Sequence, residues 1–276
     1  MHLPDCSCLA LRLDDGAVYA TLDRPAARNA LSRELVAELR KVLAAVAHRR
    51  EVRAIVLRGA GDAFCAGGDV KEMRSLLRAS PRADPDERRR RLVETSRAFG
   101  LLLAELDRAP QVVIAAVEGP AMGGGLGLVC AADVVLATGE ARFGLPETTL
   151  GLVPAQIAPF IVRRLGLARA RRFVATGAVV GAREAREIGL VDHVAADAEA
   201  LDARLAKVLH DVRRCAPHAV AATKELLRTA GAADPARFVE QAAGVFADAL
   251  LGEEGQEGLH AFAARRPPRW AAAKDE

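Results

Sequence analysis

Apolar and polar residues alternate in two segments early in the chain, residues 9–14 and 17–24. Such alternation is typical of half-buried strands. Asp15-Gly16 stands between the segments, and this pair favours the tight turn of a hairpin. Pro25 follows the second segment and ends it, because proline has no N–H to donate. The pattern therefore predicts a β-hairpin over residues 9–24.

Residues 29–50 have the different spacing of an amphipathic helix, and Ser32 stands at its N-cap position. The apolar residues that fall on one face are Leu35, Leu39, Val42, Leu43 and Val46.

Further along, apolar runs at 52–61, 110–119 and 133–138 predict buried strands, and 141–147 predicts a short extended piece. Helical spacing occurs at 69–78, 88–106, 154–165 and 167–176, with a polar, proline-interrupted stretch at 80–86. Residues 182–194 predict a short helix followed by a strand. From residue 197 the pattern is helical only, with breaks at Pro217, Gly231 and Pro235. We therefore expect an α/β core with crossover helices and a distinct C-terminal helical part.

Composition narrows the class of protein. The 276 residues suit one large domain, or one domain with an appendage. A net charge of +3, from 39 basic and 36 acidic residues, does not suggest nucleic acid as a partner. The run Arg88–Arg91 is expected to be a solvated helix face.

The cellular setting is expected to be the cytoplasm. The first residues lack an apolar run behind a basic start, so they do not resemble a signal peptide. No stretch approaches the roughly 18 apolar residues of a membrane span. Five cysteines without a spaced framework favour reduced thiols. Cys6-x-Cys8 is a poor metal motif, and we expect no metal.

Two glycine-rich loops carry the candidate chemistry. "AFCAGGDV" (residues 63–70) and "AMGGGLGLVCAAD" (residues 121–133) each follow a predicted buried strand and open a predicted helix. Unpaired N–H groups at a helix N-terminus favour negative charge. Two such loops facing each other could give two N–H donors to one developing oxyanion. Glycines at 68 and 123–125 would remove the side chains that block the approach.

Nucleotide sites and serine-nucleophile sites fit these two loops poorly. No lysine follows either loop, as a phosphate-binding loop of the G-x-x-x-x-G-K type needs, and "GGGLGLVC" lacks the G-x-G-x-x-G spacing of dinucleotide sites. No serine lies in either loop or beyond residue 96, which disfavours a serine hydrolase. Close packing of helix on strand would explain one loop but explains the pair less well.

Four motifs resemble the enoyl-CoA hydratase/isomerase (crotonase) superfamily, in its order and spacing. They are "RNAL" (28–31), "AFCAGGDV", "EGPAMGGGLGLVCAAD" (118–133) and "ARFGLPETTLGLVP" (141–154), and the likeness continues through "EGLHAFAARRPPRW" (257–270). The resemblance implies a crotonase-like spiral of ββα units, with a core over residues 1–200 and a C-terminal helical oligomerisation region over 201–276. It also implies a homotrimer or a dimer of trimers.

The resemblance assigns roles to particular residues. It implies that Gly68 and Gly124 donate the two oxyanion N–H groups and that Glu147 is the catalytic acid/base. Coenzyme A would be part of an acyl-CoA substrate, with no separate cofactor. The residues expected at its binding site are Arg28, Ala30, Ala66, Asp69 and Val70, together with Phe262 and Arg265, which often close the site of a neighbouring subunit.

One position departs from the family. Hydratases of the family usually carry a second glutamate where this chain has Gly127. Glu118 could replace it, although a structural role is favoured for Glu118, or the substrate could bring its own carboxylate into space left at Gly127. With Gln156 the pattern looks most like isohexenylglutaconyl-CoA hydratases of terpene catabolism.

We therefore expect hydration of a 2-enoyl-CoA, with a branched glutaconyl-type acyl group. Two alternatives stay open: a double-bond isomerase that works with one glutamate, and a non-catalytic acyl-CoA-binding protein. The pocket walls are expected within residues 73–106 and after Pro154.

Overall fold

A computed structural model describes residues 2–78, 84–231 and 234–271. The predicted hairpin is confirmed: β1 (Leu9–Asp14) and β2 (Ala17–Leu22) are antiparallel, with Leu9 opposite Leu22. Asp15 and Gly16 form the turn with φ values of 40° and 74°. Left-handed backbone at both positions matches the twist of the two strands.

The hairpin is one edge of a six-stranded sheet with the order β1-β2-β3-β4-β6-β9. Its other members are β3 (Ala54–Gly59), β4 (Val112–Val117), β6 (Val134–Thr138) and β9 (His193–Ala195). Every neighbouring pair after the hairpin is parallel. Parallel neighbours need crossover connections, and the helices predicted between these strands supply them.

The two faces of this sheet pack against different helices. Ile55 and Leu57 of β3 join a core that includes α1 (Arg33–Val46), α3 (Pro85–Arg108) and α4 (Gly124–Ala131). The alternate residues Ala54 and Val56 pack on the opposite face. There they meet α8 (Ala198–Arg214) through its buried Leu201, Leu205 and Leu209. Burial on both faces explains the continuous apolar runs of these strands.

The first helix is confirmed in detail. The Ser32 side chain accepts a hydrogen bond from Leu35 N at 3.1 Å. This bond satisfies one of the free N–H groups at the helix start. The five predicted apolar residues of its face are all buried.

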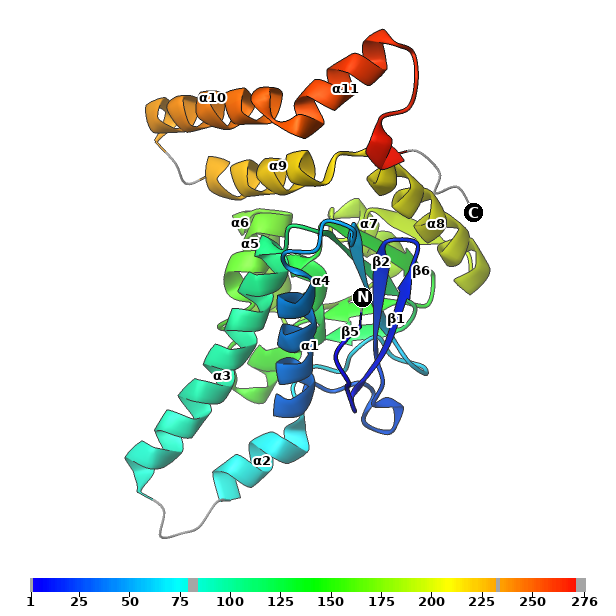
Figure 1. Cartoon of the computed structure of the whole chain (residues 1–276). Helices are drawn as coiled ribbons and strands as arrows, with labels where there is room; N and C mark the ends of the chain where they lie inside the picture. Colours follow the sequence, from blue (N-terminus) through cyan, green and yellow to red (C-terminus); the bar gives the residue numbers. More distant parts are fainter. Residues whose placement is uncertain (1, 79–83, 232–233, 272–276) are drawn as a thin grey trace.

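The second helix and the first half of the third form an arm that projects from the core on the side away from the C-terminal helices (Figure 1), whereas Leu102, Leu103 and Leu106 near the end of α3 belong to the core. After α2 (Val70–Arg78), the predicted polar stretch 80–86 lies mainly outside the described residues, and α3 already begins at Pro85 rather than at residue 88. Arg90 and Arg91 both pair with Glu87 along the exposed surface of α3. The solvated face expected for this basic run is therefore confirmed for these two arginines.

The structure has a second, smaller sheet, most of which the sequence pattern does not predict. It joins β5 (Pro120–Met122), β7 (Arg142–Gly144) and β8 (Val179–Gly181). Three residues per strand are too few to show periodicity, so the sequence pattern predicted only the segment that contains β7. α7 (Ala182–Glu187) follows β8 and leads to β9.

The predicted start of the helix at residue 154 is wrong by about one turn. Residues 154–157 form a turn, in which Ile157 N bonds to Pro154 O at 3.1 Å, and α5 (Ala158–Leu165) starts only afterwards. Gly166, with φ of 76°, separates α5 from α6 (Leu167–Ala175), as predicted.

The C-terminal helices form a separate layer on the core (Figure 1). Its members are α9 (Pro217–Ala230), α10 (Pro235–Leu251) and α11 (Glu253–Ala263), followed by the short 3-10 helix η3 (Arg269–Ala271). Neither α9 nor α10 has a buried residue. The boundary expected at residue 200 falls inside α8, whose leucines belong to the core, so the exposed layer begins at α9.

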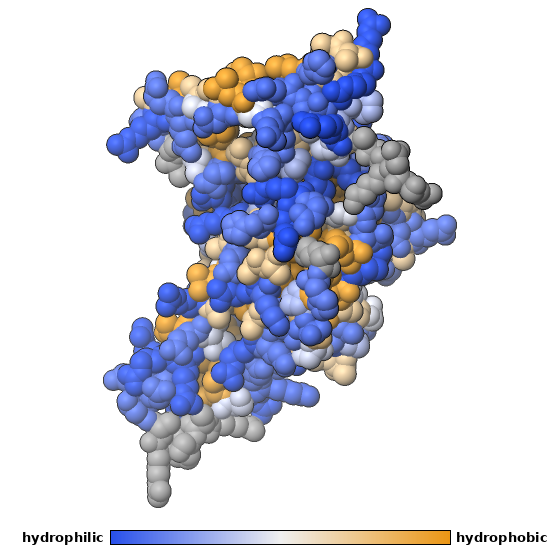
Figure 2. Space-filling view, in the orientation of Figure 1, coloured by the Kyte–Doolittle hydropathy of each residue, from blue (hydrophilic) through white to orange (hydrophobic). Residues whose placement is uncertain are grey.

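Large apolar side chains lie open on this layer. Figure 2 shows apolar surface along its outer edge. Its exposed large apolar residues include Leu227, Val239, Phe246, Leu251, Leu259 and Phe262. Within the described ranges, no helix has the length and apolar character that a membrane crossing requires.

Candidate active site

The first glycine loop lies between two other segments of the chain. On one side, Cys65 N donates to Pro120 O at 3.0 Å, and Met122 N donates to Cys65 O at 2.8 Å. On the other side, Leu31 N donates to Gly67 O at 2.7 Å, and Leu31 O accepts from Asp69 N at 3.1 Å. In a parallel bridge of this kind, one residue bonds to the neighbours of its partner. The N–H of Gly68 therefore points away from Leu31.

The amide of Gly68 is left free by this arrangement. In the part of the chain that the structure describes, its N–H donates to no backbone carbonyl. Gly68 is exposed, whereas Gly67 and Asp69 on either side are buried. The loop thus presents an unused N–H group at an accessible point.

The second glycine loop provides a matching amide. Gly124 is the first residue of α4, so its N–H has no partner within the helix, and no bond to a backbone carbonyl elsewhere in the described ranges replaces it. A Cβ placed on Gly67 would lie 3.5 Å from Gly124 N. The two loops therefore touch at their glycines, with one free N–H on each.

Glycine is required where the loops touch. Gly67 has φ of 95°, in the left-handed region that glycine alone adopts freely. A Cβ on Gly125 would lie 2.5 Å from Cys65 O, which is far inside contact distance. Any side chain at Gly125 would push the loops apart, so the glycines set the separation of the two amides.

Glu147 completes this group of residues. It lies in the short 3-10 helix η2 (Pro146–Leu150), and its Oε1 is 3.0 Å from the point that a Cβ on Gly123 would occupy. Its Oε2 is buried without a hydrogen-bond partner among the described residues. Burial raises the pKa of this carboxyl above its ordinary value. A carboxyl beside two free N–H groups, with a raised pKa, is suited to proton transfer.

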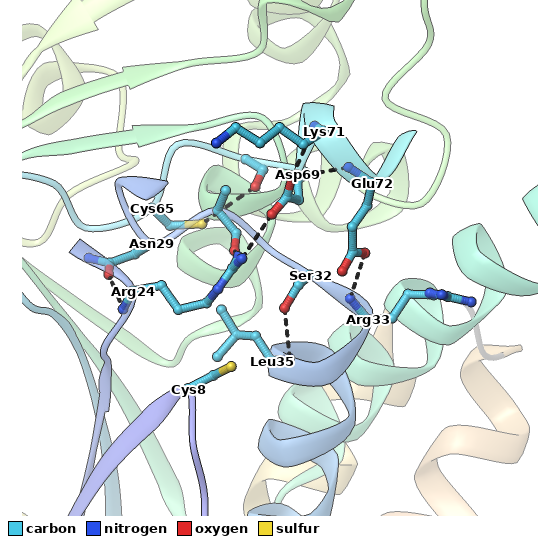
Figure 3. A network of polar contacts seen from close by, with 12 residues as sticks. Cys8, Arg24, Asn29, Ser32, Arg33, Leu35, Cys65, Asp69, Lys71 and Glu72 are labelled. Atoms are coloured by element: carbon cyan, nitrogen blue, oxygen red, sulfur yellow. Dashed lines mark hydrogen bonds and ion pairs between the residues drawn. The ribbon is translucent and has the colours of Figure 1, made fainter. Parts of the chain in front are cut away.

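A buried polar network holds the first loop in place (Figure 3). Asn29 is fully buried, with φ of 56°, and its amide donates to Ala60 O at 2.8 Å and to Ala63 O at 2.7 Å. Its carbonyl accepts from Arg24 N at 2.9 Å. These bonds tie the end of β2 to the segment that leads into Gly68.

Asp69 anchors the other end of the loop. Its carboxylate accepts from the Arg24 guanidinium at 3.0 Å and from Lys71 N at 3.0 Å, at the start of α2. Burial opposes its ionisation, but the bonds to Arg24 and to the backbone outweigh burial and lower the pKa of Asp69. The side chain of Asp69 is therefore engaged within the protein, and so is its backbone, since its N–H donates to Leu31 O at 3.1 Å and its carbonyl accepts from Met73 N at 2.9 Å.

Apolar side chains occupy the position of the missing second glutamate. A Cβ on Gly127 would lie 3.1 Å from Ile157 Cγ1, 3.1 Å from Phe99 Cζ and 3.3 Å from Leu103 Cδ1. The expectation that Gly127 leaves space for a substrate carboxylate is therefore wrong. These side chains come from α3 and from the turn before α5, which lie within the segments expected to form the pocket walls.

Glu118 is not a replacement for that glutamate. Its carboxylate accepts from Arg58 Nε at 3.1 Å, and Arg58 also pairs with Asp202 of α8 at 2.7 Å. Glu118 thus belongs to an ion-pair network that reaches the opposite face of the main sheet, and the structural role favoured for it is confirmed.

The residues expected to hold coenzyme A fall into two groups. Ala66 and Val70 lie exposed on the same loop as Gly68, and Arg28 lies beside them, because Ala66 N donates to Arg28 O at 2.9 Å. Ala30 is buried, and its carbonyl accepts from Arg24.

Phe262 and Arg265 form the second group, in and just after α11 of the C-terminal layer, apart from the glycine loops (Figure 1). Phe262 is 85% exposed. One chain therefore does not bring these two residues to its own candidate site.

Comparison with known proteins settles the family. The family model for enoyl-CoA hydratase/isomerase matches residues 12–273. The chain belongs to the enoyl-CoA hydratase/isomerase family. Its fold is that of the crotonase superfamily, as expected.

Solved structures of the family resemble the chain over nearly its whole length. Pseudomonas aeruginosa AtuE has 49% sequence identity and a TM-score of 0.91, covering 96% of this chain and 100% of that one. An enoyl-CoA hydratase/isomerase from Marinobacter aquaeolei has 43% identity and a TM-score of 0.91, covering 97% and 100%. Among relatives compared by sequence alone, the mevalonyl-coenzyme A hydratase SIDH of Beauveria bassiana is 33% identical over 260 residues, 93% of this chain and 92% of SIDH.

Proposed function

We propose that the protein is an enoyl-CoA hydratase that adds water to a 2-enoyl-CoA. The observation that carries the proposal is the meeting of two free N–H groups, of Gly68 and Gly124, beside the half-buried Glu147. Two N–H donors suit the thioester oxygen, which becomes an oxyanion when the enolate forms. Coenzyme A enters as part of the substrate, and the reaction needs no further cofactor.

The proposed reaction uses Glu147 twice. As a carboxylate, Glu147 removes a proton from water while the water oxygen bonds to C3 of the enoyl group. The electrons of the C2–C3 double bond move to the thioester oxygen, which Gly68 and Gly124 stabilise. Glu147 then returns the proton to C2, and the thioester carbonyl forms again. One carboxyl group with a raised pKa can serve as base and as acid in turn.

We infer further that the acyl group is branched and carries a distal carboxylate, as in a glutaconyl-type thioester. The sequence resembles isohexenylglutaconyl-CoA hydratases, and it has Gly127 where other hydratases carry a second glutamate. A relative named for mevalonyl-coenzyme A supports water addition as the class of reaction.

A panel of thioesters tests the reaction. We expect the enzyme to add water to a branched glutaconyl-type CoA much faster than to crotonyl-CoA, as measured by the mass gain of one water. Equal rates on both substrates would contradict the acyl assignment while leaving hydration intact. Tight binding of acyl-CoA without any turnover would instead indicate a binding protein.

Isomerisation is the second candidate, because the wall of Phe99, Leu103 and Ile157 leaves Glu147 as the one carboxyl placed at the two glycines among the described residues. A single carboxyl can carry a proton between C2 and C4 of an enoyl-CoA. Conversion of a 3-enoyl-CoA to the 2-enoyl isomer, without water addition to either, would favour this reaction over hydration.

We propose that the C-terminal layer joins subunits into a trimer or a dimer of trimers. The apolar side chains exposed on α9, α10 and α11 form a surface that burial between subunits would remove from water. Phe262 and Arg265 would then close the coenzyme A site of a neighbouring subunit, with Arg28, Ala30, Ala66, Asp69 and Val70 on the first subunit.

Light scattering tests the assembly. We expect a mass of three or six chains at micromolar protein concentration, and Phe246→Glu on α10, where the phenylalanine is 69% exposed, should shift the population toward smaller species. Asp211→Asn on α8 is a matched control with no apolar contact to lose. A stable monomer of the unmodified chain would refute the proposal.

A further inference from the structure

Gly100 lies in the interior of α3, where glycine is unfavourable because it leaves the unfolded backbone unusually free. A Cβ at Gly100 would lie 2.2 Å from Oε1 and 2.7 Å from Cδ of Gln156. The absence of a side chain at Gly100 therefore allows the amide of Gln156 to lie directly on the helix backbone.

Gln156 is held there by one hydrogen bond. Its Nε2 donates to Ser96 Oγ at 3.1 Å, one helical turn before Gly100. The hydroxyl of Ser96 and the amide of Gln156 make no other hydrogen bond among the residues that the structure describes. Two hydrogens of the pair are therefore available as donors. One is the second N–H of Gln156 Nε2, and the other is the O–H of Ser96.

This pair adjoins the wall of the candidate active site. Gln156 precedes Ile157, whose Cγ1 is 3.1 Å from the Cβ position of Gly127. Gly100 follows Phe99, whose ring lies 3.3 Å from the Cβ position of Gly124, the residue with the free N–H. The two polar side chains thus adjoin the apolar groups that lie against Gly124 and Gly127.

Exposed apolar side chains precede both members of the pair along the chain. Leu152 and Val153, four and three residues before Gln156, are 51% and 75% exposed. Val93, one turn before Ser96 on α3, is 49% exposed. An acyl chain lying here could contact these apolar side chains as well as the polar groups of Ser96 and Gln156.

We propose that Ser96 and Gln156 are specificity-determining residues that bind a carboxylate on the far part of the acyl group. The inference rests on the proposed function, since it concerns the acyl group of the same substrate. Hydrogen bonds to a charged acceptor are about twice as strong as those between neutral groups. An apolar acyl chain would bury the two donors without partners, which lowers its affinity relative to a carboxylate-bearing chain.

Binding of two saturated thioesters tests the proposal without catalysis. Glutaryl-CoA and pentanoyl-CoA have acyl chains of equal length, with a carboxylate or a methyl group at the end. We expect the unmodified enzyme to bind glutaryl-CoA more tightly. Gln156→Leu should weaken glutaryl-CoA roughly 10- to 100-fold and leave pentanoyl-CoA unchanged or tighter, as measured by calorimetry.

Gly100→Ala provides an independent test. The new methyl group meets the amide end of the Gln156 side chain, so it should displace that side chain and cause the same loss of glutaryl-CoA binding. Alanine favours helix over glycine, so the variant should unfold at the same temperature or higher. Gly139→Ala, whose Cβ would meet nothing within 4 Å, is the matched control and should change neither affinity.

The outcomes separate this inference from the proposed function. Equal weakening of both thioesters in Gln156→Leu, or no weakening of glutaryl-CoA, would overturn the role of Ser96 and Gln156. A carboxylate preference that is lost in Gln156→Leu and in Gly100→Ala, in an enzyme that never adds water, would support the binding role and refute the hydratase.

Discussion

Replacing Glu147 with Gln should lower turnover of an enoyl-CoA by about 10²–10⁴, because the enzyme loses its proton-transfer group. Affinity for acyl-CoA should change little, since the substitution keeps the size of the side chain. Single-turnover kinetics and calorimetry on a saturated acyl-CoA measure the two quantities separately. An equal loss of affinity and turnover would mean that Glu147 has a structural role.

The pH dependence of the same residue has a definite sign. Burial raises the pKa of Glu147, and the carboxylate is the form that accepts a proton from water. Activity should therefore rise with pH through a value above the ordinary pKa of glutamate, about 4.3, and this acid limb should be absent in Glu147→Gln.

The contribution of Glu147 to folding stability should fall as pH rises, whereas activity should increase. A carboxyl whose pKa is raised by folding contributes stability below its unfolded pKa and loses it as pH rises through the folded pKa. At neutral pH, Glu147→Gln should therefore be at least as stable as the unmodified protein. A large drop in its unfolding temperature at that pH would contradict this.

Gly125→Ala should reduce turnover by about 10²–10³, the usual effect of losing one oxyanion donor. The new Cβ would lie 2.5 Å from Cys65 O, so the loop that holds Gly68 must move away from α4. Gly125 has no left-handed backbone to strain, because it lies within a regular helix, where alanine is favoured over glycine. The loss should appear in kcat more than in KM for an enoyl-CoA.

Gly139→Ala serves again as the control, since its Cβ would have no neighbour within 4 Å. We expect its turnover to equal that of the unmodified enzyme. Full activity in Gly125→Ala, with a crystal structure showing both loops unmoved, would refute the view that this contact sets the spacing of the amides.

The fold was largely predictable because its strongest patterns are long. The hairpin and the helix capped by Ser32 each span several residues of clear periodicity, and the three buried strands are continuous apolar runs. The strands β5 and β8 were missed because three residues do not show a period. The sequence also could not predict that α5 starts only at Ala158. Proline is common in the first turn of a helix, and it fits equally well in the non-helical turn found at Pro154.

The candidate site was predictable where it consists of backbone. Glycines in two loops indicated free amides, and the resemblance added Glu147. The sequence could not show whether Gly127 leaves space for a substrate carboxylate. That space depends on the side chains of Phe99, Leu103 and Ile157, which come from two other segments of the chain. The sequence singled out Gln156 through the resemblance, but its contact with Ser96 across Gly100 could not be known, because it joins two segments that are distant in sequence.

The arrangement of Gly68 and Gly124 has a consequence for how such a protein can diverge. Two of its three proposed reacting groups are peptide N–H groups, which every residue except proline possesses. Mutation can therefore alter the acyl-binding wall residue by residue while these donors persist. New specificity should arise most easily on α3 and in the turn before α5, where a single substitution changes what the thioester meets and the anion-stabilising backbone stays as it was.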